Sequence, residues 1–266
     1  MKKNIVTIGF GSIAADLIQQ LQAQSTRYAV AVLLRPGSQS RSRVPTDIAV
    51  LEDIAQVCEF APDLVVEAAG HQSVRDTVPA LLAAGFPVLL SSIGALGDDE
   101  FRSRLEWTAM EHGTRIMLAS GALGALDYVR AVRDAREPVI TYESRKPVKA
   151  WEAELRQLGQ EPETLSESIT LFEGSARQAA AAYPQNLNVA AALALAGTGF
   201  EGIRVKVVCD PELQSNVHLV RVDSELGSFE ARIANSPSKS NPKSSQIVAH
   251  SLHSAIGQFF APIVIL

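Results

Sequence analysis

The sequence predicts an α/β protein in which a doubly wound parallel sheet is followed by an α+β part built on a mostly antiparallel sheet. Residues 1–120 alternate short apolar runs with helix-like segments, as parallel strands buried on both faces do. A glycine turn, GFGS, joins the first apolar run to the first helical segment. After Gly121, several segments alternate apolar and polar residues, which is typical of antiparallel strands with one covered face.

The apolar runs of residues 1–120 are short enough to be the strands of the parallel sheet. We expect these strands at residues 4–8, 28–34, 47–51, 64–68, 88–91 and 115–119. Helices are expected between them at residues 13–23, 73–84 and 98–111. The first helix places Ile13, Leu17 and Leu21 at helical spacing, which gives it one apolar face. Gly85 and Gly113 follow the other two, and glycine commonly ends a helix.

The C-terminal half is expected to open with a helix over residues 125–135. Further strands are expected at residues 139–144, 203–209, 216–223 and 228–234. The last of them alternates apolar Phe229 and Ala231 with charged Glu230 and Arg232, which predicts an antiparallel sheet with one covered face. Helices are also expected at residues 186–195 and about 246–258, with a polar loop at 235–245 before the second one.

Composition argues against several classes of partner. Apolar residues make up 47% of the chain, charged residues 20%, and the net charge is −5. A nucleic-acid partner is not expected without an excess of basic residues. Nor is a membrane span, because no apolar stretch reaches about 18 residues. Cys58 and Cys209 lie far apart in the sequence, which predicts neither a metal site nor a disulfide and favours a cytoplasmic protein.

The glycine turn predicts a dinucleotide site. Gly9, Gly11 and Ala14 follow the pattern G-x-G-x-x-G/A directly after a strand and at the start of a helix. Glycine allows the backbone to approach a pyrophosphate closely, and the helix N-terminus offers free N–H groups to it. We therefore expect Gly9, Gly11, Ser12 and Ile13 to contact the cofactor. An ordinary tight turn is the alternative.

The end of the second expected strand bears on the choice between NAD and NADP. An acidic residue there usually binds the ribose 2′-hydroxyl of NAD. This sequence has Arg35 at that place, followed by Ser38 and Arg41, which could hold a 2′-phosphate instead. The sequence predicts that NAD or NADP is used and that NADP is accepted. A solvated loop arginine is an equally good interpretation.

A second cofactor loop is expected in the stretch EAAGH. It follows the strand at 64–68, and loops at the carboxyl ends of parallel strands are where such sheets bind ligands. Ala69 and Gly70 are small enough for a ligand to lie close to the chain, and His71 comes just beyond. A histidine that merely begins a helix explains His71 equally well.

Two polar residues of the C-terminal half are candidates for chemistry. His218 falls on the same side of its strand as Val220 and Val222, so it is either a hydrogen-bonded core histidine or a proton-transfer group. Asn188 lies near the start of the helix after Pro184. It either caps that helix or hydrogen-bonds a cofactor or substrate.

Six separated stretches carry a resemblance to a known family: GFGSIA, EAAGH, SGALGALD, YPQNLNVAA, NVH and NPKSS. They occur in the order found in L-aspartate dehydrogenases, and the resemblance spans nearly the whole chain. It implies interconversion of L-aspartate with iminoaspartate, or with oxaloacetate and ammonia, using NAD or NADP. In some organisms such an enzyme supplies iminoaspartate for the synthesis of the pyridine nucleotides.

The resemblance also implies roles for single residues. Ala122 and Asn188 match positions that contact the cofactor, and His218 matches the catalytic histidine. Lys243 and Ser244 lie in the NPKSS loop, which could donate hydrogen bonds to a substrate carboxylate or simply be solvated. The family often has threonine where Ser244 stands, which leaves substrate detail open.

The resemblance and the glycine turn together suggest a division of labour. A Rossmann dinucleotide-binding domain is expected from residues 1–120 with the C-terminal helix at about 244–266, and a substrate, catalytic and oligomerisation domain from 121–243. A small-molecule substrate and a homo-oligomer are expected, with a dimer favoured. Two alternatives stay open: a reductase of the homoserine dehydrogenase or dihydrodipicolinate reductase type, and a non-enzymatic NADP-binding sensor.

Overall fold

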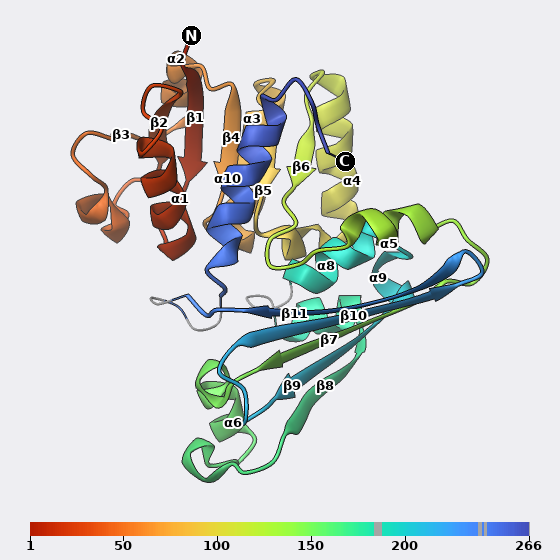
Figure 1. The fold of residues 1–266 in the computed structure, drawn as a ribbon. Helices are drawn as coiled ribbons and strands as arrows, with labels where there is room; N and C mark the ends of the chain where they lie inside the picture. Colours follow the sequence, from red (N-terminus) through yellow and green to blue (C-terminus); the bar gives the residue numbers. More distant parts are fainter. Residues whose placement is uncertain (184–187, 239–240, 242–243, 266) are drawn as a thin grey trace. The chain divides into compact units, whose positions relative to one another are not determined.

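The computed structural model describes residues 1–183, 188–238, 241 and 244–265. The chain divides into two compact units. Unit 1 consists of Met1–Gly121 and Val248–Leu266, and unit 2 of Ala122–Ile247. Figure 1 labels the helices and strands and colours them along the chain. None of the helices in the described ranges is long and apolar enough to cross a membrane.

Unit 1 is built on a six-stranded parallel sheet in the order β3-β2-β1-β4-β5-β6. Its strands are β1 (Lys3–Ile8), β2 (Tyr28–Leu33), β3 (Ala49–Leu51), β4 (Leu64–Glu67), β5 (Val88–Leu90) and β6 (Ile116–Leu118). Every residue of β4 is buried, as in a strand covered on both faces. The strand order reverses between β1 and β4, and ligands bind such sheets at the carboxyl ends beside this reversal.

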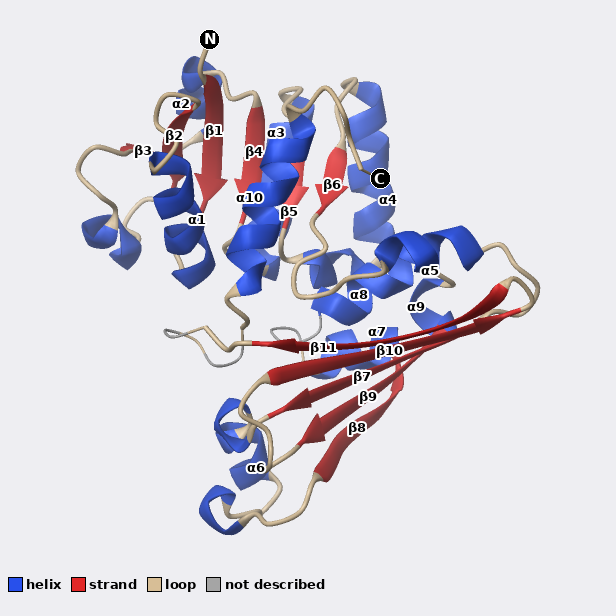
Figure 2. Cartoon of the chain, viewed as in Figure 1, coloured by secondary structure: helices blue, strands red, loops and turns tan. Residues whose placement is uncertain are grey.

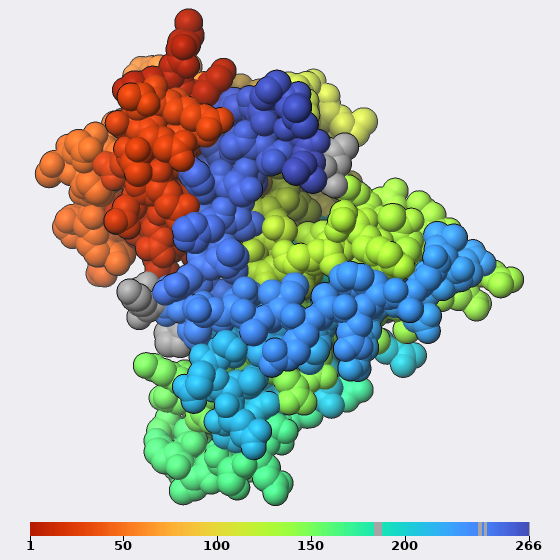
Figure 3. Space-filling view, in the orientation of Figure 1, coloured from red at the N-terminus to blue at the C-terminus, as the bar shows by residue number. Residues whose placement is uncertain are grey.

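Helices from both ends of the chain cover this sheet. They are α1 (Ser12–Gln22), α2 (Ile54–Phe60), α3 (His71–Ala83), α4 (Asp99–Glu111) and the C-terminal α10 (Ile247–Phe259). Leu252 and Ile256 of α10 share one buried cluster with Leu17 and Leu21 of α1, so both helices pack on the same face. Figure 2 shows α10 beside α1, and in Figure 3 its side chains (blue) border those of the N-terminal segments (red).

Unit 2 is built on a five-stranded sheet in the order β11-β10-β7-β9-β8. Its strands are β7 (Val139–Lys146), β8 (Ile169–Ser175), β9 (Ile203–Cys209), β10 (Asn216–Ser224) and β11 (Gly227–Asn235). Only the pair β7–β9 is parallel, and the other neighbouring strands run antiparallel. The sheet is therefore mixed, with the mostly antiparallel character that the sequence predicts.

The two faces of this second sheet differ in chemistry. On one face Ile140, Tyr142, Val205 and Val220 are buried. Helices of the unit contact strands of this sheet. The helices of the unit are α5 (Leu126–Val132), α6 (Glu152–Gln157), α7 (Ala176–Ala182), α8 (Asn188–Ala196) and α9 (Gly199–Gly202). The opposite face carries charged side chains, such as the ion pair between Arg221 and Glu230. The alternation of apolar and polar residues in these strands follows from this difference.

The predicted fold class is confirmed, and most predicted elements agree with the observed ones to within a few residues. Five observed elements, β8, α2, α6, α7 and α9, were not predicted from the sequence. β8 is an edge strand with no buried residue, so it lacks the apolar periodicity on which strand prediction rests. Residues 186 and 187, which open the predicted helix at 186–195, lie outside the described residues.

Candidate functional site

The glycine turn of unit 1 has the geometry that a bound pyrophosphate requires. Gly9 has a φ of +85°, and a Cβ atom at Gly9 would lie 2.5 Å from the Cβ atom of Ala69. Gly11 precedes α1, and no side chain among the described residues caps this helix. The first N–H groups of α1, at Ser12 and Ile13, therefore face outward at the positive end of the helix dipole. This arrangement fits a dinucleotide.

A buried carboxylate holds the second predicted cofactor loop. Glu67, the last residue of β4, is fully buried. Its Oε1 accepts hydrogen bonds from the backbone N–H groups of Ala69 (2.7 Å) and Gly70 (2.8 Å) and from Ser92 Oγ (2.9 Å). Its Oε2 accepts a bond from the backbone N–H of Ser92 at 2.9 Å. The loop is thereby fixed against Gly9.

The predicted cofactor residues of unit 1 thus lie at one edge of the sheet. His71 is the first residue of α3 and follows this loop directly. Glu67 and Ser92 were not among the residues predicted to form the site. The stretch EAAG held the available signal for Glu67. A carboxylate buried at the end of a strand needs N–H donors close by, and the backbone of the small residues that follow can supply them.

We expect Glu67→Gln to weaken cofactor binding. An amide group in place of the carboxylate turns one NH2 donor toward N–H or O–H donors, so one bond is lost and a buried donor is left unpaired. The KM for NADH and NADPH should rise roughly tenfold, with a smaller change in kcat. Steady-state kinetics checks this, with Glu59→Gln on the exposed side of α2 as the control. A lower melting temperature with unchanged KM would mean that Glu67 serves folding alone.

The loop after β2 holds several basic residues, which play different parts. Arg35 is exposed at its start. Arg41 forms an ion pair with Glu52. Arg43, which was not predicted to take part, donates to the backbone oxygen of Phe10 in the glycine turn (3.3 Å) and to Ser40 Oγ (2.9 Å). Arg43 therefore links this loop to the predicted pyrophosphate turn.

In unit 2, His218 lies on the buried face of β10 and is only 3% exposed. Its Nδ1 is 2.8 Å from the hydroxyl of Tyr142. Its Nε2 is buried and has no hydrogen-bond partner among the described residues. Burial, and secondly the positive charge of Lys146, lower the pKa of His218 to about 3. The imidazole is therefore neutral at neutral pH, and one ring nitrogen is left for a ligand.

Polar side chains gather around His218 on the same face of the sheet. Ser144 stands directly opposite His218 in the strand register, and Lys146 follows two residues further along β7. Asn216 Nδ2 donates to the backbone oxygen of Ser244 (3.3 Å) and to Ser245 Oγ (3.1 Å). We call Ser144, Lys146, Asn216 and His218 the polar cluster.

The polar cluster has unused hydrogen-bonding capacity. Ser144 Oγ, Asn216 Oδ1 and His218 Nε2 are buried and lack hydrogen-bond partners among the described residues. Buried polar atoms are nearly always paired, so three such atoms on one face of a sheet indicate a place for a ligand. Sequence alternation marked His218 as buried, but Ser144, Lys146 and Asn216 were not predicted.

The remaining predicted residues of unit 2 have different surroundings. The backbone oxygen of Ala122 accepts a hydrogen bond of 2.7 Å from Asn235 Nδ2 at the end of β11. Asn188 is half-buried and begins α8. Ser244 borders the polar cluster through its bond with Asn216. Lys243 lies outside the described residues. No group of three or more possible metal ligands occurs in the part of the chain that the structure describes.

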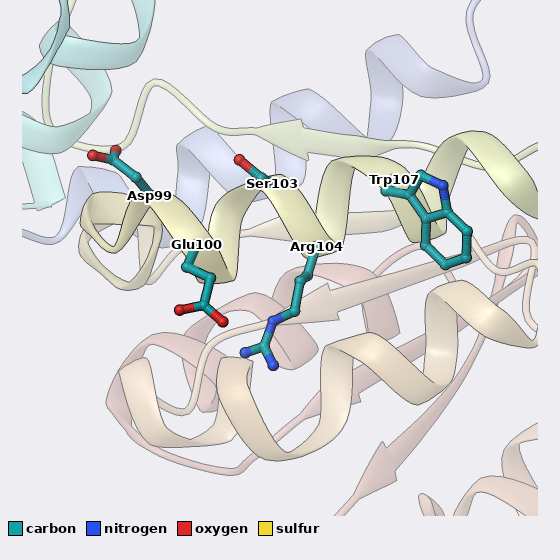
Figure 4. A pocket seen from close by; sticks show the side chains of 5 residues that line it. All are labelled: Asp99, Glu100, Ser103, Arg104 and Trp107. Carbon is teal, nitrogen blue, oxygen red and sulfur yellow. The ribbon is translucent and has the colours of Figure 1, made fainter.

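The surface of α4 carries an open hollow of about 490 Å³. Its lining side chains all belong to α4, as Figure 4 shows: Asp99, Glu100, Ser103, Arg104 and Trp107. Trp107 is 63% exposed. Because these groups spread along one helix instead of converging from several elements, the hollow lacks the enclosed form of a ligand site. None of the residues predicted to bind cofactor or substrate lines it.

Two family models match the chain. The model described as "Aspartate dehydrogenase, C-terminal" matches residues 127–259, and "Homoserine dehydrogenase, NAD binding domain" matches residues 9–119. L-aspartate dehydrogenase 2 of Bordetella pertussis is 43% identical over 262 residues, which cover 98% of both chains. L-aspartate dehydrogenase of Ruegeria pomeroyi is 38% identical and covers 96% of this chain and 91% of its own.

Solved structures show the same fold. Aspartate dehydrogenase from Thermotoga maritima superposes with a TM-score of 0.78 over 100% of both chains, at 24% sequence identity. A hyperthermophilic archaeal homoserine dehydrogenase in complex with NADPH gives a TM-score of 0.60 at 13% identity, again over 100% of both chains.

Proposed function

The chain belongs to the L-aspartate dehydrogenase family and is an oxidoreductase, and on this premise we propose a specific reaction for it. It oxidises L-aspartate to iminoaspartate, which water converts to oxaloacetate and ammonia, and it catalyses the reverse reductive amination. The buried His218, with its unpaired Nε2 inside the polar cluster, is the observation that carries this proposal.

Unit 1 would hold the nicotinamide cofactor. A Cβ atom at Gly9 would invade the EAAG loop, so the backbone there is open in the way that a pyrophosphate needs. The turn from Gly9 to Ile13 would bind the phosphates, and Ala69, Gly70 and His71 would border the nucleotide. In unit 2, Ala122 and Asn188 are proposed to contact it as well. When bound, the nicotinamide would supply the acceptor for the hydride that leaves C2 of aspartate.

His218 would act as the general acid and base of the reaction. Its Nε2 takes a proton from the substrate amine, or from the water that attacks the imine, and returns it in the reverse direction. The Tyr142 hydroxyl can accept from Nδ1–H or donate to a bare Nδ1, so it accommodates both ring tautomers. Burial raises the pKa of Tyr142, which keeps this hydroxyl protonated throughout.

The basic loop after β2 leads us to propose that NADP is accepted. Arg35→Ala should raise the KM for NADPH roughly tenfold and leave the KM for NADH nearly unchanged, because only NADPH has the 2′-phosphate that Arg35 would pair with. Arg41→Ala is the matched control, since Glu52 already neutralises Arg41. Steady-state kinetics with both cofactors measures the effect. An equal change for NADH and NADPH would assign Arg35 no role in selecting the cofactor.

Oxidation of NADH and NADPH with oxaloacetate and ammonia tests the proposed reaction. Turnover that requires both substrates supports an aspartate dehydrogenase. Turnover with aspartate semialdehyde or dihydrodipicolinate instead would contradict it and indicate a reductase of a related type.

We also propose a homo-oligomer, with a dimer favoured, and light scattering of the purified protein would give its mass directly.

A further inference from the structure

The chain first passes from unit 1 to unit 2 between Gly121 and Ala122, a few residues after β6. Gly121 has a φ of +64°, the left-handed conformation that glycine adopts without strain. This turn follows the carboxyl end of a parallel strand, and such sheets bind their ligands at that edge. Two side chains from distant parts of the chain form hydrogen bonds with its backbone.

The first of these side chains is Ser251, which lies on α10 in unit 1. Its Oγ accepts a hydrogen bond of 2.9 Å from the backbone N–H of Gly121 and lies 3.0 Å from Ser120 Oγ. Serine within a helix often bonds to a carbonyl of its own helix, whereas Ser251 bonds to a turn 130 residues earlier. Leu252 beside it and Ala119 before the turn belong to the same buried cluster, so the core of unit 1 holds both partners in place.

The second side chain is Asn235, the last residue of β11 in unit 2. Its Nδ2 donates a hydrogen bond of 2.7 Å to the backbone oxygen of Ala122. Asn235 lies opposite Asn216 in the register of the sheet, so the pairing of β11 with β10 fixes its backbone. The turn is therefore held at two consecutive residues, at Gly121 through its N–H and at Ala122 through its carbonyl. Each bond lies within one unit.

The peptide group between these two bonds has no partner of its own. It consists of the carbonyl of Gly121 and the N–H of Ala122, and neither makes a hydrogen bond with the residues that the structure describes. Both residues are half-buried. Backbone groups away from bulk water are nearly always paired, with protein, water or a ligand. A peptide group that is fixed and still offers a donor and an acceptor suits a ligand with a carboxamide.

The position of this turn in the sheet indicates which part of a dinucleotide would reach it. The glycine turn follows β1 and the basic loop with Arg35 follows β2, on one side of the reversal in strand order. The turn at Gly121 follows β6, on the other side. Such sheets bind one nucleotide of the pair on each half. With the adenosine at β2, the nicotinamide falls to the loops after β4, β5 and β6, and its carboxamide has both an acceptor and a donor.

We propose that Ser251 and Asn235 are positioning residues, which hold the Gly121–Ala122 peptide in place for the carboxamide of the nicotinamide. The inference rests on the proposed nicotinamide-dependent activity and adds the residues that set the position of the ring. Neither side chain contacts the cofactor, since each acts through the backbone to which it is bonded. Loss of either bond lets the turn move. The nicotinamide then binds more weakly, while the contacts of the adenosine and the pyrophosphate stay as they are.

Isothermal titration calorimetry with NADH and with ADP-ribose tests this proposal, because ADP-ribose lacks the nicotinamide ring. Ser251→Ala and Asn235→Asp each remove one hydrogen bond to the turn, and Asn235→Asp retains the size of the side chain. We expect both variants to bind NADH roughly tenfold more weakly than the wild type, because one hydrogen bond to the turn is lost. Their affinity for ADP-ribose should stay within about twofold of the wild-type value, which also shows that they are folded.

Two further variants serve as controls. Ser251→Thr retains the hydroxyl group and should bind NADH as the wild type does. Ser254→Ala changes an exposed serine of the same helix and should leave both affinities unchanged. An equal loss for NADH and ADP-ribose in Ser251→Ala and Asn235→Asp, or no loss for NADH, would overturn the proposal. So would a loss in Ser251→Thr as large as that in Ser251→Ala.

The proposed reaction is tested separately from these positioning residues, because the calorimetry requires no turnover. If the variants bound NADH normally, wild-type turnover with oxaloacetate and ammonia would still support an aspartate dehydrogenase. Failure of the wild type to bind either reduced cofactor would contradict both proposals.

Discussion

Turnover should fall by about 10²- to 10⁴-fold when His218 is replaced by glutamine, which is the usual loss on removing a general acid or base. The Gln side chain is close to imidazole in size and can still bond to the Tyr142 hydroxyl, which lies 2.8 Å from Nδ1 in the wild-type protein. It cannot accept and release a proton near neutral pH. The measurement is kcat for oxaloacetate and ammonia with NADPH.

His253→Gln is the matched control for this experiment. His253 is partly buried on α10 in unit 1, where its Nε2 is 3.1 Å from Gln24 Nε2. Its replacement should leave kcat within about twofold, since single replacements away from the reacting groups have small effects. Turnover near the wild-type value in His218→Gln would exclude His218 from proton transfer. It would leave His218 as a core histidine.

The same variant has a second signature, in acid stability. The pKa of His218 is about 3 in the folded protein, against a usual value of 6.5. Below pH 6.5 this histidine is protonated in the unfolded chain but stays neutral in the folded protein. The stability that is present above pH 6.5 is therefore lost as the pH falls toward 3. At about pH 5 the wild type should have lost about 2 kcal/mol more than His218→Gln, relative to neutral pH. Denaturant unfolding at both pH values measures the difference.

The fold could be predicted well from the sequence because the burial of most strands is reflected in the order of their apolar and polar residues. Strands covered on both faces read as continuous apolar runs, as in β4, where all residues are buried. Strands with one covered face read as alternation, as in β11, whose residues alternate between exposed and half-buried. β8 lacked both signals, since its position is determined by pairing with β9 and not by its own pattern.

The site was predictable only where a local pattern encodes it. Gly9 and Gly11 form such a pattern, and His218 stood out because a titratable residue occupied an apolar position. Lys146 did not stand out, because it follows Arg145 in a stretch that reads as charged surface. The alternation Ile140, Tyr142, Ser144, Lys146 places it on the buried face, but only once the strand is known to extend to Lys146.

Arg43, Glu67 and Ser92 could not be predicted from the sequence, because their contacts join residues far apart along the chain. Arg43 reaches the backbone of Phe10 from 33 residues away. Glu67 accepts bonds from Ser92, 25 residues further along the chain. Such pairs depend on which strands become neighbours in the sheet, and a local pattern does not carry that information. In both cases the missed residue supports a loop for which the sequence predicts a role in cofactor binding.

Gly9→Ala should weaken the binding of NADH and NADPH alike, by roughly 100-fold, because backbone strain and a steric clash both arise in the glycine turn. The φ of +85° is unfavourable for alanine, and the new Cβ atom would lie 2.5 Å from the Cβ atom of Ala69. Ala69 cannot give way easily, because its N–H is bonded to the buried carboxylate of Glu67. The turn itself must therefore move, and with it the N–H groups that would hold the pyrophosphate. Fluorescence titration with each reduced cofactor measures the loss.

Gly113→Ala separates backbone strain from the clash with the loop. Gly113 follows α4 with a φ of +62°, and nothing lies within 4 Å of a Cβ atom placed on it. Alanine there should cost about 1–2 kcal/mol of stability through strain alone and leave cofactor affinity unchanged. If Gly9→Ala bound both cofactors as well as Gly113→Ala does, close approach at the glycine turn would not be needed. The dinucleotide would then have to be held elsewhere in unit 1, since the clash at Gly9 would have proved as harmless as strain alone at Gly113.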